Sequence, residues 1–185
     1  MSIIYGERIR LRAIEAEDVQ RFYEWVNDPE VTRGLTLYLP MSMREEQGWY
    51  ENIVKRPPDE RPLAIEVKTG GGWKHIGNCS VFDIDWVARA AELGIMIGDK
   101  SAWNQGYGTE TMTLLLRHGF ETLNLNRLFL RVYNDNPRAI RTYEKAGFVH
   151  EGKMREAKFK HGKYDDVHIM SVLRREWDAL NTEAR

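Results

Sequence analysis

Residues 103–110 read Trp103-Asn104-Gln105-Gly106-Tyr107-Gly108-Thr109-Glu110 and lie between a predicted strand and a predicted helix. Glycines in such a loop let backbone N–H groups approach a ligand without interference from Cβ atoms. The amino end of the following helix adds about half a positive charge. Together these features predict a site for an anion such as phosphate or pyrophosphate. The alternative is a turn whose glycines serve only a tight backbone geometry, and the loop alone leaves it open.

Two well-known phosphate-binding loops do not match this stretch. A Walker A loop needs Lys and then Ser or Thr after its last glycine, whereas Gly108 is followed by Thr109 and Glu110. The dinucleotide-binding fingerprint needs a third glycine where Thr111 stands, and it follows its strand directly, whereas residues 99–102 intervene here. The loop therefore predicts an anion cradle of another kind, with a nucleotide phosphate kept as an alternative ligand.

Strands and helices alternate along the rest of the chain. Apolar residues at every second position predict strands over residues 9–13, 63–67, 76–84, 92–98, 127–133 and 164–173, and from residue 148 onward. Helical spacing of apolar residues predicts helices over residues 18–26, 42–54, 112–120 and 137–146. The second helix starts with a capping box formed by Ser42 and Glu45. This order predicts an α/β sandwich with a mixed sheet, whose middle strand–helix–strand unit requires a parallel pair.

Length and composition fit one globular domain. The chain has 185 residues and 42% of them are hydrophobic, which is too apolar for a disordered chain and predicts a single domain over residues 1–185. Its 27 basic and 28 acidic residues give a net charge of −1, which offers no general attraction to nucleic acid. Cys79 is the single cysteine, and the 5 histidines form no close ligand pair. We therefore expect no disulfide within the chain and no metal site.

The amino end and the charged segments indicate the compartment and the partners. The N-terminus lacks the apolar run of a signal peptide, and no segment approaches the roughly 18 apolar residues of a membrane span. Acidic neighbours dilute a late basic run formed by Lys153, Arg155, Lys158, Lys160 and Lys163. We expect that run to be a solvated surface rather than a nucleic-acid footprint. The sequence thus predicts a cytoplasmic protein with neither a nucleic-acid nor a membrane partner.

Two blocks of sequence together resemble the GNAT superfamily of N-acetyltransferases. The first block consists of the strand Ala91-Glu92-Leu93-Gly94-Ile95-Met96-Ile97 followed by residues 103–110. The second places Asn136, Ala139, Ile140, Tyr143, Lys145, Gly147 and Phe148 in the pattern Asn-x-x-Ala-Ile-x-x-Tyr-x-Lys-x-Gly-Phe. The resemblance is closer to the branch that contains ribosomal-protein N-terminal and spermidine N-acetyltransferases. Trp103 departs from the pattern, because the acetyl-CoA signature of the family begins with Gln or Arg there.

The resemblance implies a fold and a way of binding acetyl-CoA as cosubstrate. The implied sheet is largely antiparallel, with six to seven strands, about four flanking helices and a central parallel unit. Backbone amides of residues 105–109 would hold the pyrophosphate, and the main chain of residues 95–97 would pair with the pantetheine arm. Asn136 would bond the pantetheine or order the site. The expected cofactor-binding residues are Ile95, Met96, Ile97, Trp103, Asn104, Gln105, Gly106, Tyr107, Gly108, Thr109, Asn136 and Lys145.

The implied reaction is direct acetyl transfer to a primary amine. Tyr143, with a partly exposed hydroxyl, would donate a proton to the leaving sulfur. Backbone N–H groups near Met96 and Ile97 would polarise the thioester carbonyl. Glu92 is the candidate base, acting through water. The alternatives are a Tyr143 that packs in its helix and a Glu92 that is an ordinary solvated strand residue.

The acceptor is less constrained than the donor. The family allows a polyamine, an amino sugar, an antibiotic or a protein N-terminus, and a homodimer is compatible with it. Tyr38, Trp49 and Trp86 are candidates for the acceptor cleft, and the alternative role for each is packing. Arg138 and Arg141 are candidates for the 3′-phosphate of CoA, because they share a predicted helix with Asn136 and Tyr143. The alternative function is a CoA-binding regulatory or interaction module with little turnover.

Overall fold

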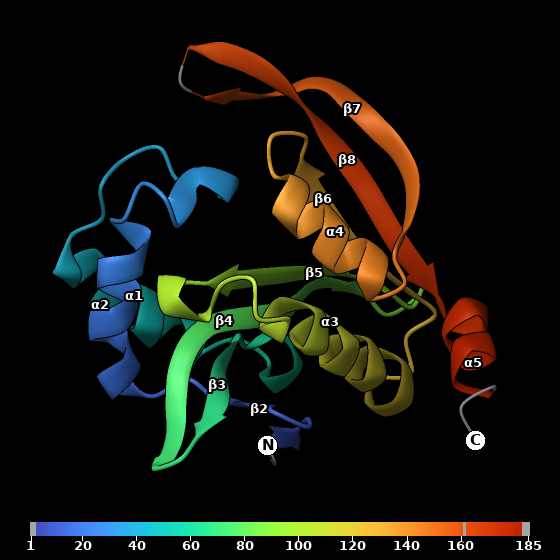
Figure 1. The fold of residues 1–185 in the computed structure, drawn as a ribbon, viewed down its shortest axis with the longest axis horizontal. Coiled ribbons are helices and arrows are strands. Elements are labelled where there is room, and N and C mark those ends of the chain that lie inside the picture. Colours follow the sequence, from blue (N-terminus) through green and yellow to red (C-terminus); the bar gives the residue numbers. More distant parts are fainter. Residues whose placement is uncertain (1–2, 161, 183–185) are drawn as a thin grey trace.

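The sheet is mixed and has eight strands (Figure 1). In the computed structural model, which describes residues 3–160 and 162–182, the strands follow the order β1-β2-β3-β4-β5-β6-β8-β7. They are β1 (Ile4–Tyr5), β2 (Ile9–Ala13), β3 (Leu63–Thr69), β4 (Gly72–Asp85), β5 (Ala90–Ile97), β6 (Arg127–Tyr133), β7 (Val149–Lys160) and β8 (Lys163–Leu173). Among these described residues, β5 and β6 pair in parallel and all other neighbours are antiparallel.

Five helices flank the sheet in the described part of the chain. They are α1 (Val19–Val26), α2 (Met43–Ile53), α3 (Tyr107–Arg117), α4 (Pro137–Lys145) and α5 (Arg174–Thr182). The expected α/β fold with a largely antiparallel sheet and one parallel unit is confirmed. The sheet exceeds the expected six to seven strands by the two-residue β1, and α5 adds a helix to the expected four. β1 is too short to show a periodic pattern. α5 is as long as α4, but its apolar residues form no buried stripe, since Trp177 is buried and Leu180 is exposed.

The parallel pair is short, and this creates an opening in the sheet. Residues 90–92 of β5 pair with residues 127–129 of β6, and the pairing ends there. Beyond Glu92, β5 continues along β4 to Ile97, while β6 continues along β8 to Tyr133. The two strands therefore part, and the backbone of residues 93–97 has no strand partner on the β6 side within the described chain.

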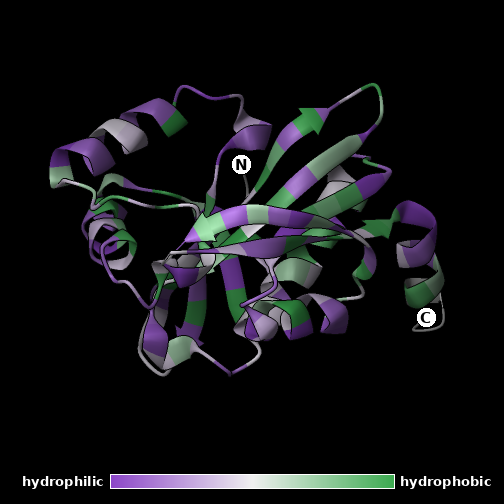
Figure 2. Cartoon of the chain, turned by 90° about the horizontal axis from the view of Figure 1, so that it is seen from above, coloured by the Kyte–Doolittle hydropathy of each residue, from purple (hydrophilic) through white to green (hydrophobic). Residues whose placement is uncertain are grey.

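Two apolar clusters hold the layers together. The larger cluster joins the sheet to α3 and α4 and includes Leu11, Leu115, Phe120 and Leu128, all of them fully buried. A smaller cluster lies beneath α1 and α2, around Phe22, with Met96 packed against it. Figure 2 shows hydrophobic and hydrophilic residues alternating along the strands, as expected for a sheet with one face in the core.

The predicted capping box at the start of α2 is confirmed. The Ser42 hydroxyl accepts a hydrogen bond from the backbone N–H of Glu45 at 3.2 Å, and the Glu45 carboxylate accepts one from the backbone N–H of Ser42 at 2.7 Å. These bonds fix the first turn of α2 and therefore the direction in which its next residue, Glu46, points. No helix in residues 3–160 and 162–182 is long and apolar enough to cross a membrane.

Most of the basic run on the hairpin of β7 and β8 is exposed, as expected, but two of its lysines are not. Lys158 is buried. Its Nζ lies 3.1 Å from the Asp135 carboxylate and 3.8 Å from the centre of the Tyr133 ring. The Nζ of Lys160 donates hydrogen bonds to the carbonyl oxygens of Thr32 and Leu35. The hairpin, drawn at the top of Figure 1, is thereby tied to the loop that follows α1.

Candidate functional site

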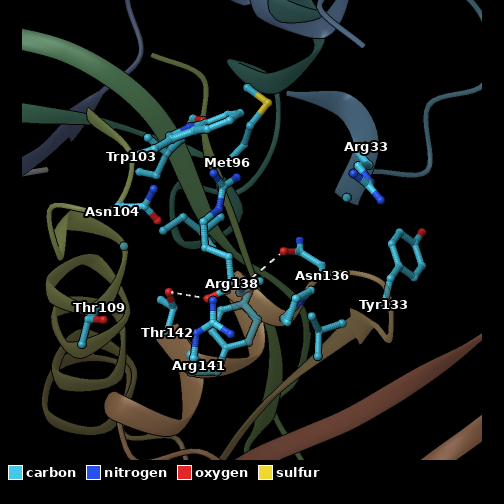
Figure 3. A pocket seen from close by; sticks show the side chains of 18 of the residues that line it. Arg33, Met96, Trp103, Asn104, Thr109, Tyr133, Asn136, Arg138, Arg141 and Thr142 are labelled. Carbon is cyan, nitrogen blue, oxygen red and sulfur yellow. Dashed lines mark hydrogen bonds between the residues drawn. The ribbon is translucent and has the colours of Figure 1, made fainter. Parts of the chain in front are cut away.

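The opening between β5 and β6 contains a cavity of about 520 Å³, which we call the first cavity (Figure 3). Its walls come from the end of β5, the loop before α3, the first turn of α3, the end of β6 and one side of α4. Every residue expected to bind the cofactor lines this cavity except Gln105. The structure thus brings together two sequence blocks that are separated in the chain by residues 111–135.

The glycine loop presents unpaired donors to the first cavity. Gly106 is the N-cap of α3, with φ +83°, and no side chain caps the helix. Among the described residues, no acceptor binds the backbone N–H groups of residues 107–109. A Cβ atom at Gly108 would lie 3.2 Å from Cγ2 of Thr142, so this glycine lets α3 approach α4 closely. The same loop therefore combines tight backbone geometry with free N–H donors, which are the groups that an anion requires.

Gln105 faces away from the cavity. Its side-chain Nε2 donates a hydrogen bond to the backbone carbonyl oxygen of Ser101 at 2.5 Å. Its backbone carbonyl oxygen accepts a hydrogen bond from Nη1 of Arg8 at 3.0 Å. Both contacts hold the outer side of the loop. Its role in this structure is to shape the loop, and it does not line the cavity.

Trp103, the residue that departs from the family pattern, has a clear structural role. Its indole Nε1 donates a hydrogen bond to the carbonyl oxygen of Ile97 at 2.8 Å. The guanidinium of Arg138 lies over its ring, 3.8 Å from the ring centre. The indole therefore joins the last residue of β5 to α4 across the cavity (Figure 3).

Positive charge predominates around the first cavity. Arg33, Arg138, Arg141 and Lys145 line it and form no ion pair within the described residues. Its two acidic residues, Glu30 and Asp135, are paired with Lys100 and Lys158. Burial lowers the pKa of Arg138, which favours a compensating anion nearby. Sequence reasoning anticipated the two arginines of α4 but missed Arg33, because it reaches the site from a distant loop without any motif.

Asn136 orders the start of α4. Its Oδ1 accepts a hydrogen bond from the backbone N–H of Ala139 at 3.2 Å, and this bond is drawn in Figure 3. A Cβ atom at Gly34 would come within 2.6 Å of its Nδ2. The Oδ1 is thus used as a helix cap, and the backbone of the loop after α1 packs directly against the amide.

Tyr143 is more deeply placed than expected. The residue lines the first cavity and is only 8% exposed, so less of its side chain is exposed than expected. Within the described residues the hydroxyl has no hydrogen-bond partner. Burial raises its pKa to about 12, so the hydroxyl is protonated at neutral pH. It is therefore an available proton donor on the cavity wall.

Glu92 lines neither the first cavity nor the second cavity that is described below. It is 6% exposed, and its two carboxylate oxygens accept hydrogen bonds from Nε and Nη2 of Arg131 at 2.9 and 2.8 Å. It is therefore not the solvated residue of the alternative interpretation. A carboxylate held in this way is poorly placed to take a proton from a ligand, so the geometry does not favour Glu92 as the base.

A second cavity, of about 820 Å³, lies between the α1–α2 side of the molecule and strands β4 and β5. It shares Leu35, Ile95 and Met96 with the first cavity, so the two meet at the end of β5. Its charged residues are Glu46, Glu60, Asp83 and Arg56. None of the three carboxylates forms an ion pair within the described chain. The second cavity is therefore acidic where the first is basic.

The three aromatic residues expected at an acceptor cleft lie at different places in the structure. Trp49 lines the second cavity, whereas Tyr38 and Trp86 do not and are 63% and 53% exposed. Cys79 also borders this cavity, and burial raises the pKa of its thiol, so it is not an activated nucleophile. No group of three or more His, Cys, Asp or Glu side chains within the described ranges could hold a metal ion.

Comparison with known proteins agrees with this geometry. The family model of acetyltransferase (GNAT) domains matches residues 8–149. Spermidine N(1)-acetyltransferase of Vibrio cholerae is 33% identical over 168 residues, covering 91% of this chain and 94% of that protein. The enzyme of the same name from Escherichia coli K12 is 27% identical over 169 residues, covering 91% and 88%. The crystal structure of the Vibrio cholerae spermidine N-acetyltransferase with CoA and spermine superimposes with a TM-score of 0.84, at 27% identity, covering 93% and 99% of the two chains.

Proposed function

The chain belongs to the GNAT family of acetyltransferases, and from this premise we propose that its first cavity binds acetyl-CoA and its second cavity binds the amine acceptor. It is an acetyl-CoA-dependent N-acetyltransferase. The observation that carries the proposal is the meeting of a basic and an acidic cavity at Ile95 and Met96. Bound acetyl-CoA supplies an acetyl group activated as a thioester, and the chain's residues position that group for attack.

The residues of the first cavity fit the donor. The unpaired N–H groups at the start of α3 suit a pyrophosphate, and the unpaired cations of the wall suit its further charges. The backbone of residues 95–97 does not pair with β6, so it offers hydrogen bonds to an extended amide-containing arm. Backbone N–H groups near Met96 and Ile97 would also stabilise negative charge on the acetyl oxygen.

Tyr143 would complete the transfer on the donor side. When the amine nitrogen bonds to the acetyl carbon, the carbon–sulfur bond breaks and the sulfur keeps its electron pair. The Tyr143 hydroxyl, which is protonated and lacks a partner among the described residues, would donate its proton to that sulfur. The proton lost from the amide nitrogen would restore the phenol through solvent.

A primary amine fits the second cavity because amines are cationic in water and the cavity carries unpaired carboxylates. The relatives that bear the name spermidine N-acetyltransferase make a polyamine the first acceptor to test. Amino sugars, antibiotics and peptide N-termini complete the panel. A cytoplasmic location and a homodimer remain predictions from sequence.

The donor site is tested by thermal stabilisation with CoA. Gly108→Trp places an indole beside Thr142 and within the first cavity, so we expect it to abolish the CoA-dependent rise in melting temperature. Gly152→Trp is the matched control, because a Cβ atom there meets nothing within 4 Å. Stabilisation retained by Gly108→Trp would refute the placement of the pyrophosphate. Mass spectrometry of the amine panel with acetyl-CoA then identifies which acceptor is acetylated.

A further inference from the structure

We propose that Glu46 binds the ammonium group of the acceptor and takes its proton, while Oδ1 of Asn78 accepts a second N–H of the same group. This inference rests on the proposed function, because it assigns a catalytic base to the second cavity. It goes further in naming the residue, its partner and the charge of the substrate. Neither residue belongs to the two motifs that identify the family.

Glu46 is a buried carboxylate without a protein partner. It is 5% exposed and lines the second cavity, and no hydrogen bond or ion pair engages its carboxylate among the described residues. Burial is the main cause that raises its pKa, and the neighbouring Glu45 adds to the effect. An ionised carboxylate in such a place is costly unless a cation joins it. The capped first turn of α2 holds it there.

Asn78 supplies a second, independent sign that this cavity binds a ligand. Its Oδ1 is buried and has no hydrogen-bond partner among the described residues, which is rare for a buried polar atom. Asn78 lines the same cavity as Glu46 and is paired in the sheet with Met96, where the two cavities meet. A carboxylate and an amide oxygen both accept hydrogen bonds, so the ligand that suits them is a hydrogen-bond donor.

The surroundings select a cation over a neutral donor. The other charged residues of the cavity are Glu60, Asp83 and Arg56, so together with Glu46 its formal charge is −2. The rings of Phe22 and Trp49 line the same space and lie 5.3 Å apart. Aromatic faces attract ammonium groups and also contact methylene carbons. The chemistry therefore fits an aliphatic primary ammonium.

The proton transfer balances without a further reactant. The N–H bond of the ammonium breaks, an O–H bond forms on the Glu46 carboxylate, and the electron pair stays on nitrogen. That pair is then free to bond to the acetyl carbon at the Met96 end of the cavity. Glu46 returns the proton to solvent after the product leaves.

Kinetics of Glu46→Gln test the proposal, with Glu51→Gln as control because Glu51 is an exposed carboxylate on the same helix. The probe is whichever of n-butylamine, putrescine, spermidine, glucosamine and a short peptide the unaltered enzyme acetylates with the highest kcat/KM. We expect Glu46→Gln to lower kcat/KM for this amine about 100-fold at pH 7 and to leave the KM for acetyl-CoA unchanged. Glu51→Gln should stay within about two-fold of the unaltered enzyme on both measures.

The pH profile separates a base from a merely structural residue. The defect of Glu46→Gln should shrink as the pH approaches the pKa of the probe, because the amine then arrives already deprotonated. A defect that is equal at all pH values, or no defect, would overturn the proposal. The proposal would also be overturned if CoA stabilises the protein but the protein acetylates none of these amines. Absence of CoA stabilisation in the unaltered protein would instead refute the donor site, and with it the premise.

Discussion

Arg131 and Glu92 bridge the point at which the sheet divides. Nε and Nη2 of Arg131 donate to the two carboxylate oxygens of Glu92 at 2.9 and 2.8 Å. Glu92 is the last residue of β5 that pairs with β6, and Arg131 lies two residues beyond its partner Phe129. The ion pair thus spans the two strands where they begin to part, and it raises the pKa of Arg131. We interpret it as the tie that holds the opening of the first cavity.

Replacing Glu92 should therefore affect stability more than chemistry. Glu92→Gln leaves the guanidinium of Arg131 without its anionic partner. Because the Arg131 side chain is 53% exposed, water solvates the guanidinium, and we expect the free energy of unfolding to fall by only about 0.5–1 kcal/mol. Urea denaturation measures this fall, with Glu51→Gln as the unpaired control. The dependence of kcat/KM on pH should keep its shape. Loss of the acidic limb in Glu92→Gln, with normal stability, would instead identify Glu92 as the base.

Tyr143→Phe should lower kcat about 100-fold with little change in CoA affinity, because only the proton donor is removed. The pH dependence has a defined sign. Since burial raises the pKa of Tyr143 to about 12, the hydroxyl stays protonated through neutral and moderately alkaline pH. Activity should accordingly not decline between pH 7 and 10 through ionisation of this group. Single-turnover rates measure the effect, and an unchanged rate in Tyr143→Phe would remove the acid from the mechanism.

Arg141→Gln should weaken donor binding without slowing transfer. Arg141 is an unpaired cation on the wall of the first cavity, and we expect its loss to raise the KM for acetyl-CoA several-fold at constant kcat. Binding of acetyl-dephospho-CoA, the analogue without the 3′-phosphate, shows which phosphate Arg141 contacts. If Arg141 contacts the 3′-phosphate, Arg141→Gln and the unaltered enzyme should bind this analogue equally well. A difference that persists with the analogue would point to the pyrophosphate.

Sequence was sufficient to predict which residues line the first cavity, because their placement depends on local backbone. A glycine with positive φ at position 106, a glycine at the α3–α4 contact and a capped α4 must occur at fixed spacing. The first cavity accordingly contains nearly all the residues expected there. Gln105 differs because only its backbone spacing, and not the direction of its contacts, is encoded in the motif.

The surroundings of the carboxylates follow no such local rule. Glu46 looks like one of several acids on an amphipathic helix, and only tertiary packing shows that it is buried without a partner. Glu92 sits on the predicted face of its strand, yet Arg131 reaches it from a strand that is 39 positions away. Contacts between distant side chains decide which carboxylate is free, and one sequence does not contain them.

Glu46→Gln should also reveal a conflict between stability and function. A carboxyl whose pKa is raised in the folded protein ionises more easily in the unfolded chain, so rising pH lowers the free energy of unfolding. This loss of stability is absent below the ordinary Glu pKa of about 4.3. It grows as pH rises towards the pKa of Glu46 in the folded protein and is constant above that pKa. Gln has nearly the same size and no charge. We therefore expect Glu46→Gln without ligand to be more stable than the parent at pH 7–8, with a melting temperature about 2–4 °C higher for each kcal/mol of penalty removed. The difference should vanish near pH 4, and thermal unfolding at both pH values measures it. A variant that is less stable than the parent at pH 7 would mean that Glu46 has a stabilising partner in the folded protein.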